Sequence, residues 1–393
     1  MKIIKFPVLF LLALLLFTFS LSSCGGEDPA PDNDVVIEPN DPSDPNLADK
    51  NTFDEFVVSQ MKSQGTPAMG VLIFKGDKIL HEKYYGKSNI EQNLDLANDH
   101  LFLIASVSKT VTGAALLRLY DEGKFGLDDP INNYLPFEVN VPNHNTPITF
   151  RMLLTHTSSI VDTDELFVYN FGSDTPIELK DFMESYLKVG GSLYSTNNFL
   201  DAAAGTEFEY SNAGSALIGV LVEQISNQSF VDYTRQTIFS PLGMNKTSWR
   251  LDEITGTIVQ PYEVENGNFV KIEHYTMPDY PNGGLRTTPR EFSNFLNAIM
   301  NDGSYNGYQV LQPATAKMMY TPQTSLDPTM GFHMSLEEES LGLWGHNGGE
   351  RGTSTDAVFD PITKIGIIVF TNVEDIETQQ IYIKGFELGK KLQ

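Results

Sequence analysis

The chain is poor in cysteine and in positive charge. It has one cysteine, Cys24, among 393 residues, and 26 lysines and arginines against 51 aspartates and glutamates. A single cysteine excludes a disulfide within the chain and a cysteine-rich metal site. The formal net charge of −25 argues against nucleic acid as a partner, because a phosphate-binding protein needs a basic face. With 41% hydrophobic and 20% charged residues, most of the chain has the composition of a globular protein.

Long hydrophobic runs are also scarce. The run at residues 8–19 has the length of the apolar region of a secretory signal and is short for a membrane span. Lys2 and Lys5 precede it, and small residues followed by Cys24 end it, which resembles the lipobox of bacterial lipoproteins. We therefore expect a signal peptide over residues 1–23 and a lipid on Cys24 that anchors the protein to a membrane. The alternative is an ordinary signal peptide, or an uncleaved anchor, with an incidental cysteine.

The segment that follows the cysteine has few apolar residues. Proline, aspartate and asparagine dominate residues 24–50, and such a composition cannot form a core, so we expect a disordered tether. Gly25 follows Cys24 in place of the aspartate that retains lipoproteins at the inner membrane of familiar Gram-negative bacteria. This favours anchoring of the protein to the outer membrane of the bacterial cell envelope, on either its periplasmic or its outer face.

The composition becomes typical of a folded domain from residue 51 to residue 393. Apolar residues at helical spacing predict a first helix, with one face formed by Phe53, Phe56, Val57, Val58 and Met61. Apolar runs separated by turn residues predict two hairpins, with strands at 69–74, 79–85, 354–359 and 365–370. A closing helix is expected at about 375–391. Strands at both ends of the domain predict an α+β fold, with an antiparallel sheet flanked by helices and a mostly helical subdomain over about 110–300.

The stretch that begins at Leu101 leads from apolar residues into a helix of small residues. Ser106 lies at or near the first turn of that helix, and Lys109 is three residues further, so both side chains lie on one face. A serine hydroxyl becomes a nucleophile when a base or a cation lies beside it. The same spacing occurs at Ser59/Lys62 and Ser185/Lys188, and the alternative is a serine helix cap with a solvated lysine.

Two further motifs contain polar side chains suited to a cleft. Tyr210 and Asn212 are two residues apart in a loop just before the apolar helix expected at 216–225. The sequence Trp-Gly-His-Asn-Gly-Gly at 344–349 lies just before the second predicted hairpin, and its glycines would let the backbone approach a ligand closely. A surface turn with a loop aromatic or a loop histidine is the alternative at both places.

Taken in order, the three motifs resemble the signatures of one family. The patterns Ser-x-x-Lys, Tyr-x-Asn and Lys-or-His-x-Gly are those of the penicillin-recognising serine hydrolases, which include class C β-lactamases, D,D-carboxypeptidases and related esterases. Similar supporting stretches occur at 153–160, 241–244 and 283–285. The resemblance covers about residues 52–390 and implies a β-lactamase/transpeptidase-like fold.

The resemblance also implies catalytic roles. Ser106 is expected to attack a carbonyl carbon and become acylated, and Lys109 is expected to accept or relay the serine proton. Tyr210, with a pKa lowered by the neighbouring Lys109, is expected to act as the base and to activate water for deacylation.

The remaining implied roles concern substrate binding. Asn212 is expected to position the substrate or the lysine, and His346 to line the edge of the pocket. The backbone N–H groups of the serine and of Gly349 are expected to form an oxyanion hole, on a strand that also contains Asn347 and Gly348. No cofactor is implied, and the histidines show no metal-ligand spacing.

The third motif also bears on the substrate. β-Lactamases have a lysine where this chain has His346, and a largely neutral histidine offers a weaker anchor for a substrate carboxylate. We therefore expect a serine hydrolase of modest-sized esters or amides, similar to carboxylesterases or to D-peptide and D-amino-acid amide hydrolases. The alternatives are a β-lactamase or D,D-carboxypeptidase acting on penicillins or cell-wall peptides, and a non-catalytic lipid-anchored binding protein. The sequence leaves the oligomeric state open.

Overall fold

The computed structural model describes residues 40–393. The signal peptide predicted at 1–23, the lipidation site Cys24 and most of the tether predicted at 24–50 lie outside the described residues. Within the part of the chain that is described, no helix combines the length and apolar character needed to cross a membrane.

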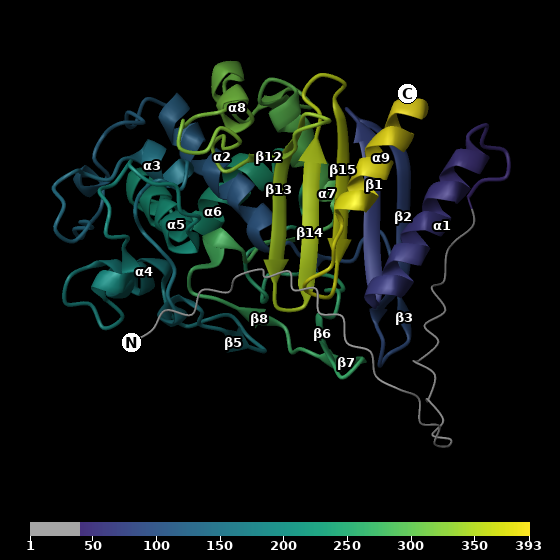
Figure 1. The fold of residues 1–393 in the computed structure, drawn as a ribbon, viewed down its shortest axis with the longest axis horizontal. Coiled ribbons are helices and arrows are strands. Elements are labelled where there is room, and N and C mark those ends of the chain that lie inside the picture. The colour runs from purple at the N-terminus through teal and green to yellow at the C-terminus, as the bar shows by residue number, and fades with distance from the viewer. Residues whose placement is uncertain (1–39) are drawn as a thin grey trace, which may run out of the picture. The chain divides into compact units, whose positions relative to one another are not determined.

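The centre of the fold is a seven-stranded antiparallel sheet built from both ends of the domain (Figure 1). The order of its strands is β12 (Ser335–Glu338), β13 (Leu343–Glu350), β14 (Thr353–Phe359), β15 (Ile365–Thr371), β1 (Ala68–Lys75), β2 (Lys78–Asn89) and β3 (Leu94–Asp95). Strand β1 from the N-terminal half pairs with β15 from the C-terminal end, Val71 opposite Val369. The α+β fold and both predicted hairpins are confirmed, with strands slightly longer than expected.

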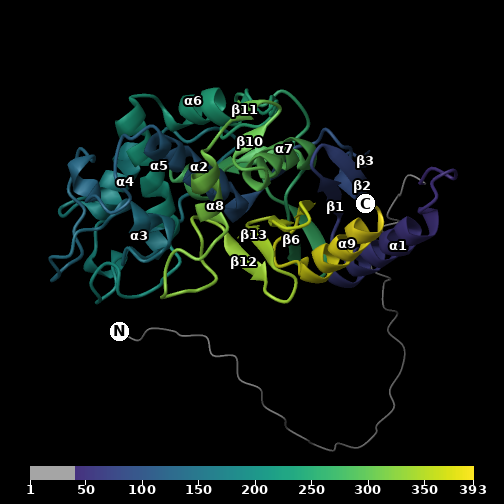
Figure 2. The same cartoon turned by 90° about the horizontal axis from the view of Figure 1, so that it is seen from above.

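Two helices cover one face of the sheet and a third covers the other. Helices α1 (Leu47–Gln64) and α9 (Gln379–Lys391) pack on the same face, whereas α7 (Pro289–Met300) packs on the opposite face (Figure 2). On α1, Phe53, Val57 and Met61 are buried, as expected for residues one turn apart. Phe56 and Val58 are only partly buried at the edge of this layer.

The ends of these two helices differ from the sequence prediction. Helix α1 begins at Leu47, inside the segment predicted as a tether, and the Asn40 side chain donates hydrogen bonds to Asn51 and Asp54 of that helix. The acidic, proline-rich composition concealed this helix start. Helix α9 begins four residues later than expected, since Asp375 has a positive φ of 59° that an α-helix does not continue.

The helical part of the domain packs beside the sheet and shares a large apolar core with it (Figure 1). Its helices are α2 (Ser108–Asp121), α3 (Phe150–Leu154), α4 (Leu179–Leu187), α5 (Asn212–Ser226), α6 (Phe230–Thr234) and α8 (Pro313–Met319). Helices α2 and α5 are almost entirely buried and pack against each other. Helix α2 is rich in small residues, among them Gly113, Ala114 and Ala115.

Four short two-stranded ribbons also occur in the described residues. They are formed by β4 (Phe102–Leu103) with β9 (Arg286–Thr287), β5 (Asn170–Phe171) with β8 (Tyr275–Thr276), β6 (Tyr262–Glu265) with β7 (Asn268–Lys271), and β10 (Ser304–Tyr305) with β11 (Tyr308–Gln309). Strand β4 leads directly to the start of α2, where the serine of the first motif lies.

Candidate active site

Ser106 lies in a tight turn at the junction of β4 and α2. The turn is a 3₁₀ segment, Ala105–Val107, which precedes the α-helix. Ala105 has φ of 45°, a left-handed conformation that is unfavourable for residues other than glycine. Such backbone strain persists only where the surrounding structure imposes it, and it is frequent at active sites. The turn presents a partly exposed serine at the N-terminal end of a buried helix.

Lys109 lies one helical turn beyond the serine, with its side chain completely buried. Its Nζ atom lies 2.8 Å from Ser106 Oγ and 2.7 Å from the carbonyl oxygen of Asn282. Burial lowers the pKa of Lys109 to about 7, although the negative charges of Asp162, Asp279 and Glu350 act in the opposite direction. A large fraction of Lys109 is therefore neutral at neutral pH and able to accept a proton from the serine hydroxyl.

Tyr210 completes this group from the loop that precedes α5. Lys109 Nζ lies 5.0 Å from the centre of its ring, and its hydroxyl forms a hydrogen bond with Ser106. The expectation of a lowered tyrosine pKa is wrong. Burial raises the pKa of Tyr210 above its ordinary value, and the charges of Asp162 and Glu337 raise it further. The resting side chain is thus a phenol, which donates or relays a proton.

Asn212 begins helix α5 and faces a carboxylate that the sequence did not identify. Its Nδ2 atom donates to Asp162 Oδ2 over 2.9 Å, and its backbone N–H donates to the same oxygen over 3.0 Å. Asp162 also accepts from Ala213 N–H, so it caps the N-terminus of α5. The amide of Asn212 is therefore held by Asp162, and its predicted role in positioning a substrate or Lys109 remains a prediction.

The third motif lies within strand β13, directly before the hairpin of β14 and β15, as the sequence predicted. Gly348 and Gly349 pair with Thr355 and Ser354 of β14. A Cβ atom on Gly348 would lie 2.8 Å from the Ile104 carbonyl oxygen and 3.0 Å from the Ser106 nitrogen. Only glycine lets the strand approach the serine turn this closely. A Cβ atom on Gly349 would meet no atom within 4 Å, and the role of its N–H in an oxyanion hole remains a prediction.

The two polar residues of this motif are held by neighbouring groups. His346 is buried, its ring centre lies 6.1 Å from that of Tyr210, and burial together with the charge of Lys109 lowers its pKa to about 4. The imidazole is accordingly uncharged at neutral pH. Asn347 is exposed, and its Nδ2 atom donates to Glu337 Oε2 over 2.9 Å. Instead of a fixed positive charge, this edge of the site presents a neutral ring and an amide paired with a carboxylate.

The sequence reasoning did not identify several residues around this centre. They lie far away in the chain, four of them in loops (Asp162, Asp279, His156 and His333) and one, Glu337, in strand β12. Asp279 is buried and accepts a 2.6 Å hydrogen bond from the Asn282 side chain, whose backbone holds Lys109. One of them, His156, lies in the stretch 153–160, which resembles the family as a supporting sequence. That resemblance was the signal from which this residue could have been identified.

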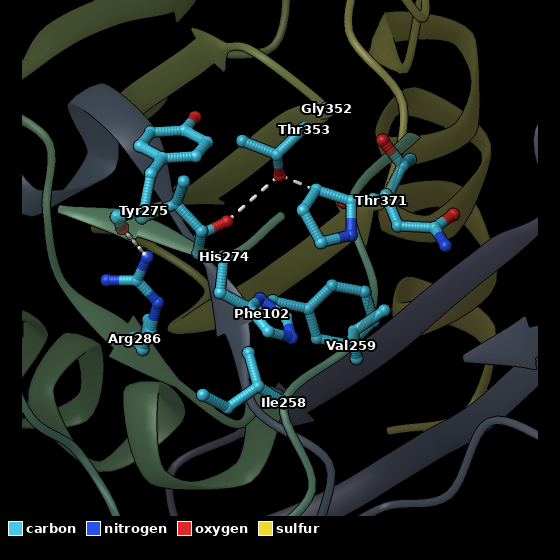
Figure 3. A pocket seen from close by; sticks show the side chains of 12 residues that line it. Phe102, Ile258, Val259, His274, Tyr275, Arg286, Gly352, Thr353 and Thr371 are labelled. Atoms are coloured by element: carbon cyan, nitrogen blue, oxygen red, sulfur yellow. Dashed lines mark hydrogen bonds between the residues drawn. The ribbon is translucent and has the colours of Figure 1, made fainter. Parts of the chain in front are cut away.

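Two small cavities lie near these elements. One, of about 10 Å³, is lined by residues that include Asn212, Asp279, Asn282 and Glu350 and therefore borders the site. The other, also about 10 Å³, is lined by residues from β4, β9 and β14 and is shown in Figure 3. There the buried Arg286 donates to the carbonyl oxygen of Tyr275. Each has room for about one water molecule, so neither is a substrate cavity.

Among residues 40–393, no group of three histidine, cysteine or acidic residues could hold a metal ion.

Comparison with known proteins agrees with the fold described above. A family model described as Beta-lactamase matches residues 53–382. Beta-lactamase-like protein 4 of Dictyostelium discoideum is 28% identical over 95% of this chain and 67% of its own length. A class C beta-lactamase structure superposes with a TM-score of 0.72 at 19% identity, covering 90% of this chain and 99% of that one.

A solved structure with a different activity is similarly close in fold. D-amino acid amidase from Ochrobactrum anthropi SV3 has a TM-score of 0.68 at 20% identity, covering 88% of this chain and all of that one (100%). Since the family model covers most of the domain and the fold agrees, the chain belongs to the β-lactamase family, whose members are hydrolases.

Proposed function

We propose that the protein is a serine hydrolase that forms an acyl-enzyme on Ser106 and cleaves an ester or amide of modest size. The observation that carries this proposal is the buried Lys109, with Nζ 2.8 Å from Ser106 Oγ and a pKa near neutrality. A lysine amine in this state is a general base in direct contact with its nucleophile.

The acylation step follows from these contacts. Neutral Lys109 takes the proton of Ser106 as Oγ bonds to the substrate carbonyl carbon, and the carbonyl oxygen gains the negative charge. The backbone N–H groups of Ser106 and Gly349 stabilise that oxygen, and one such donor typically contributes roughly 10²–10³ in rate. When the bond to the leaving group breaks, the Tyr210 hydroxyl gives that group a proton and recovers one from the Lys109 ammonium.

Deacylation uses the same groups in reverse. A water molecule loses a proton to Lys109, directly or through Tyr210, as its oxygen bonds to the acyl carbon. The bond between that carbon and Ser106 Oγ then breaks, and the serine oxygen regains a proton from Lys109. Both half-reactions leave the three side chains in their starting protonation states.

The electrostatics of the site favour substrates without a carboxylate next to the reacting carbonyl. His346 is uncharged at neutral pH, and Asn347 is paired with Glu337. Lys109 also lies within electrostatic range of Asp162, Asp279 and Glu350. This supports ester or D-amino-acid amide hydrolysis ahead of the second candidate, a β-lactamase or D,D-carboxypeptidase. The similarity in fold to a class C beta-lactamase is the observation in favour of that second candidate.

A panel of substrates separates these functions. It consists of p-nitrophenyl esters of short acids, D-amino-acid amides and nitrocefin, each tested with wild-type protein and with Ser106→Ala. The proposal expects ester or amide turnover that Ser106→Ala abolishes, with nitrocefin turnover much slower. Nitrocefin turnover comparable to ester turnover would favour the second candidate. If the folded wild type turns over none of the substrates, a non-catalytic binding protein becomes the better description.

We also propose that the enzyme is held at the cell envelope, in the outer membrane, by lipid on Cys24. The support is the sequence pattern of residues 1–24 alone, and the alternative is release after cleavage of an ordinary signal peptide. Detergent phase partitioning of the wild type and of Cys24→Ser after expression with the native leader tests it. The wild type should enter the detergent phase, whereas Cys24→Ser should not.

A further inference from the structure

Behind Tyr210, on the side away from solvent, two histidines stack on one another. The ring centre of His156 lies 4.6 Å from that of Tyr210, with the planes tilted by 30°. His333 stacks on His156 with ring centres 5.0 Å apart and planes 16° apart. Both histidines are almost completely buried. The stack therefore runs His333, His156, Tyr210, and the amine of Lys109 lies 5.0 Å from the centre of the tyrosine ring.

Hydrogen bonds connect His156 to the segment that contains the tyrosine. Its Nδ1 atom accepts the backbone N–H of Ser211 over 3.2 Å, and its backbone carbonyl accepts the N–H of Glu209 over 2.9 Å. The residues on both sides of Tyr210 are thus fixed to one histidine. Because Nδ1 accepts, the proton of this imidazole is on Nε2. That atom is buried and has no hydrogen-bond partner among residues 40–393.

His333 connects the same stack to the helix of the nucleophile. Its Nδ1 atom lies 3.0 Å from the backbone carbonyl oxygen of Lys109, and its Nε2 atom lies 3.3 Å from Ser215 Oγ on α5. A carbonyl oxygen only accepts, so Nδ1 donates here. On α2, a Cβ atom at Gly113 would lie 3.0 Å from the Cβ of His333. The glycine therefore permits the histidine to lie directly against the helix.

The backbone at both histidines is strained. His156 has φ of 54° and His333 has φ of 52°, both in the left-handed region that is unfavourable for residues other than glycine. Glycine or asparagine would occupy these positions at lower cost. Both histidines are nevertheless found here, at strained and buried positions that lie side by side. The contacts made by their imidazole rings account for this.

We propose that His156 and His333 are positioning residues that hold the ring of Tyr210 against Lys109 and Ser106 for acyl transfer. The closed path of contacts from the Lys109 carbonyl through His333, His156 and Tyr210 to the Lys109 amine carries this inference. It rests on the proposed function, because a positioned tyrosine matters only if Ser106 reacts. A displacement of about 1 Å in a catalytic group can cost about 10²-fold in rate, which sets the expected effect.

The test uses His156→Asn in the full-length protein. Asparagine tolerates the left-handed backbone and offers an oxygen to Ser211 N–H, but it removes the ring behind Tyr210. We expect kcat for a p-nitrophenyl ester to fall about 10²-fold, with KM within about threefold of wild type. His333→Asn keeps a donor for the Lys109 carbonyl and should also lower kcat. Because the two rings act through one contact, the fold-loss of kcat in the double variant should be much smaller than the product of the fold-losses in the two single variants.

The control is His81→Asn, which removes another buried histidine, paired with Asp54 of α1 at 2.8 Å. It should lower the melting temperature and leave kcat within about threefold of wild type. A folded His156→Asn with wild-type kcat would overturn the positioning role, and His333→Asn supplies the same test if His156→Asn does not fold. An equal kcat loss in His81→Asn would also overturn it.

A failure of the proposed function would give a different result from a failure of the positioning role. In that case the wild type itself would neither turn over the ester nor be labelled at Ser106 by a fluorophosphonate. Labelled wild-type protein together with unaffected histidine variants would reject only the positioning role.

Discussion

The Nζ atom of Lys109 lies 2.8 Å from the Oγ atom of Ser106, at a place where protein encloses the lysine side chain completely. The same amine donates to the carbonyl oxygen of Asn282 and lies 5.0 Å from the centre of the Tyr210 ring. An amine in these surroundings loses its proton far more readily than one in water, because burial penalises the charged form. The proposed base is thereby placed in direct contact with the proposed nucleophile, and Tyr210 remains a neutral phenol.

The charge state of Lys109 predicts the effect of an arginine at this position. Lys109→Arg keeps a cation near Ser106, but a guanidinium stays protonated at every accessible pH and cannot act as a base. We expect kcat/KM to fall by about 10²–10⁴-fold, the usual contribution of a general base. Steady-state kinetics on a p-nitrophenyl ester checks this, with Lys62→Arg on α1 as the control. If Lys109→Arg kept more than a tenth of the wild-type activity, a fixed positive charge beside Ser106 would be enough for catalysis and no base would be needed there.

A second prediction concerns pH. Because the neutral amine is the active form, kcat/KM should rise with pH through about 7, the pKa of Lys109. Burial raises the pKa of Asp279 to about 7, and its ionised form raises the pKa of Lys109, so Asp279→Asn should move the acid limb to lower pH. Asp252→Asn, a change at an exposed acid, should leave the limb in place. An acid limb that moves to higher pH in Asp279→Asn would contradict the assignment.

Tyr210 gives a third prediction. Tyr210→Phe keeps the ring over Lys109 and removes the hydroxyl that bonds to Ser106. We expect kcat to fall about 10²-fold through loss of proton transfer, while the acid limb stays near pH 7 because it belongs to Lys109. Tyr194→Phe is the matched control. If the acid limb disappeared in Tyr210→Phe, the limb would belong to the tyrosine, and the assignment of Lys109 as the base would be wrong.

The sheet behind the site gives a prediction about stability. Asp356 of β14 is buried, and burial raises its pKa to about 8, with the charge of Glu337 acting in the same direction. A carboxyl whose pKa is higher in the folded state than in the unfolded state destabilises the fold progressively as pH rises between the two values. Asp356→Asn lacks this ionisation and keeps an oxygen that can accept the Thr378 hydroxyl.

The expected result is a difference in melting temperature that changes with pH. The melting temperature of Asp356→Asn minus that of the wild type should increase steadily from pH 5 to pH 8. The control, Asp128→Asn, removes an exposed carboxyl whose hydrogen bond from Arg151 lowers its pKa. Its difference from wild type should be constant over the same range. A constant difference for Asp356→Asn as well would show that this carboxyl ionises normally.

The sequence predicted the parts of this structure that depend on local pattern. Alternating and continuous apolar runs predicted strands β1, β2, β14 and β15, and the three-residue spacing placed Ser106 and Lys109 on one face. The start of α9 was missed because the left-handed conformation of Asp375 has no signal in the apolar pattern of residues 375–391.

What the sequence could not predict is the environment of each site residue. The raised pKa of Tyr210 results from burial and from Asp162 and Glu337, which lie 48 and 127 residues away in the sequence. The stack of His156 on His333 joins positions 177 residues apart. No local pattern encodes such contacts, and the family resemblance supplied signature residues without the groups that surround them.

The most direct test of the account is covalent labelling of the intact protein with a fluorophosphonate, read by mass spectrometry. The account predicts one adduct per wild-type chain, located on the peptide that contains Ser106, with a labelling rate that rises through about pH 7 as Lys109 becomes neutral. Ser106→Ala should remain unlabelled. An adduct on another residue, or a folded wild type that stays unlabelled at pH 8, would contradict the central claim that Ser106 is a nucleophile activated by Lys109.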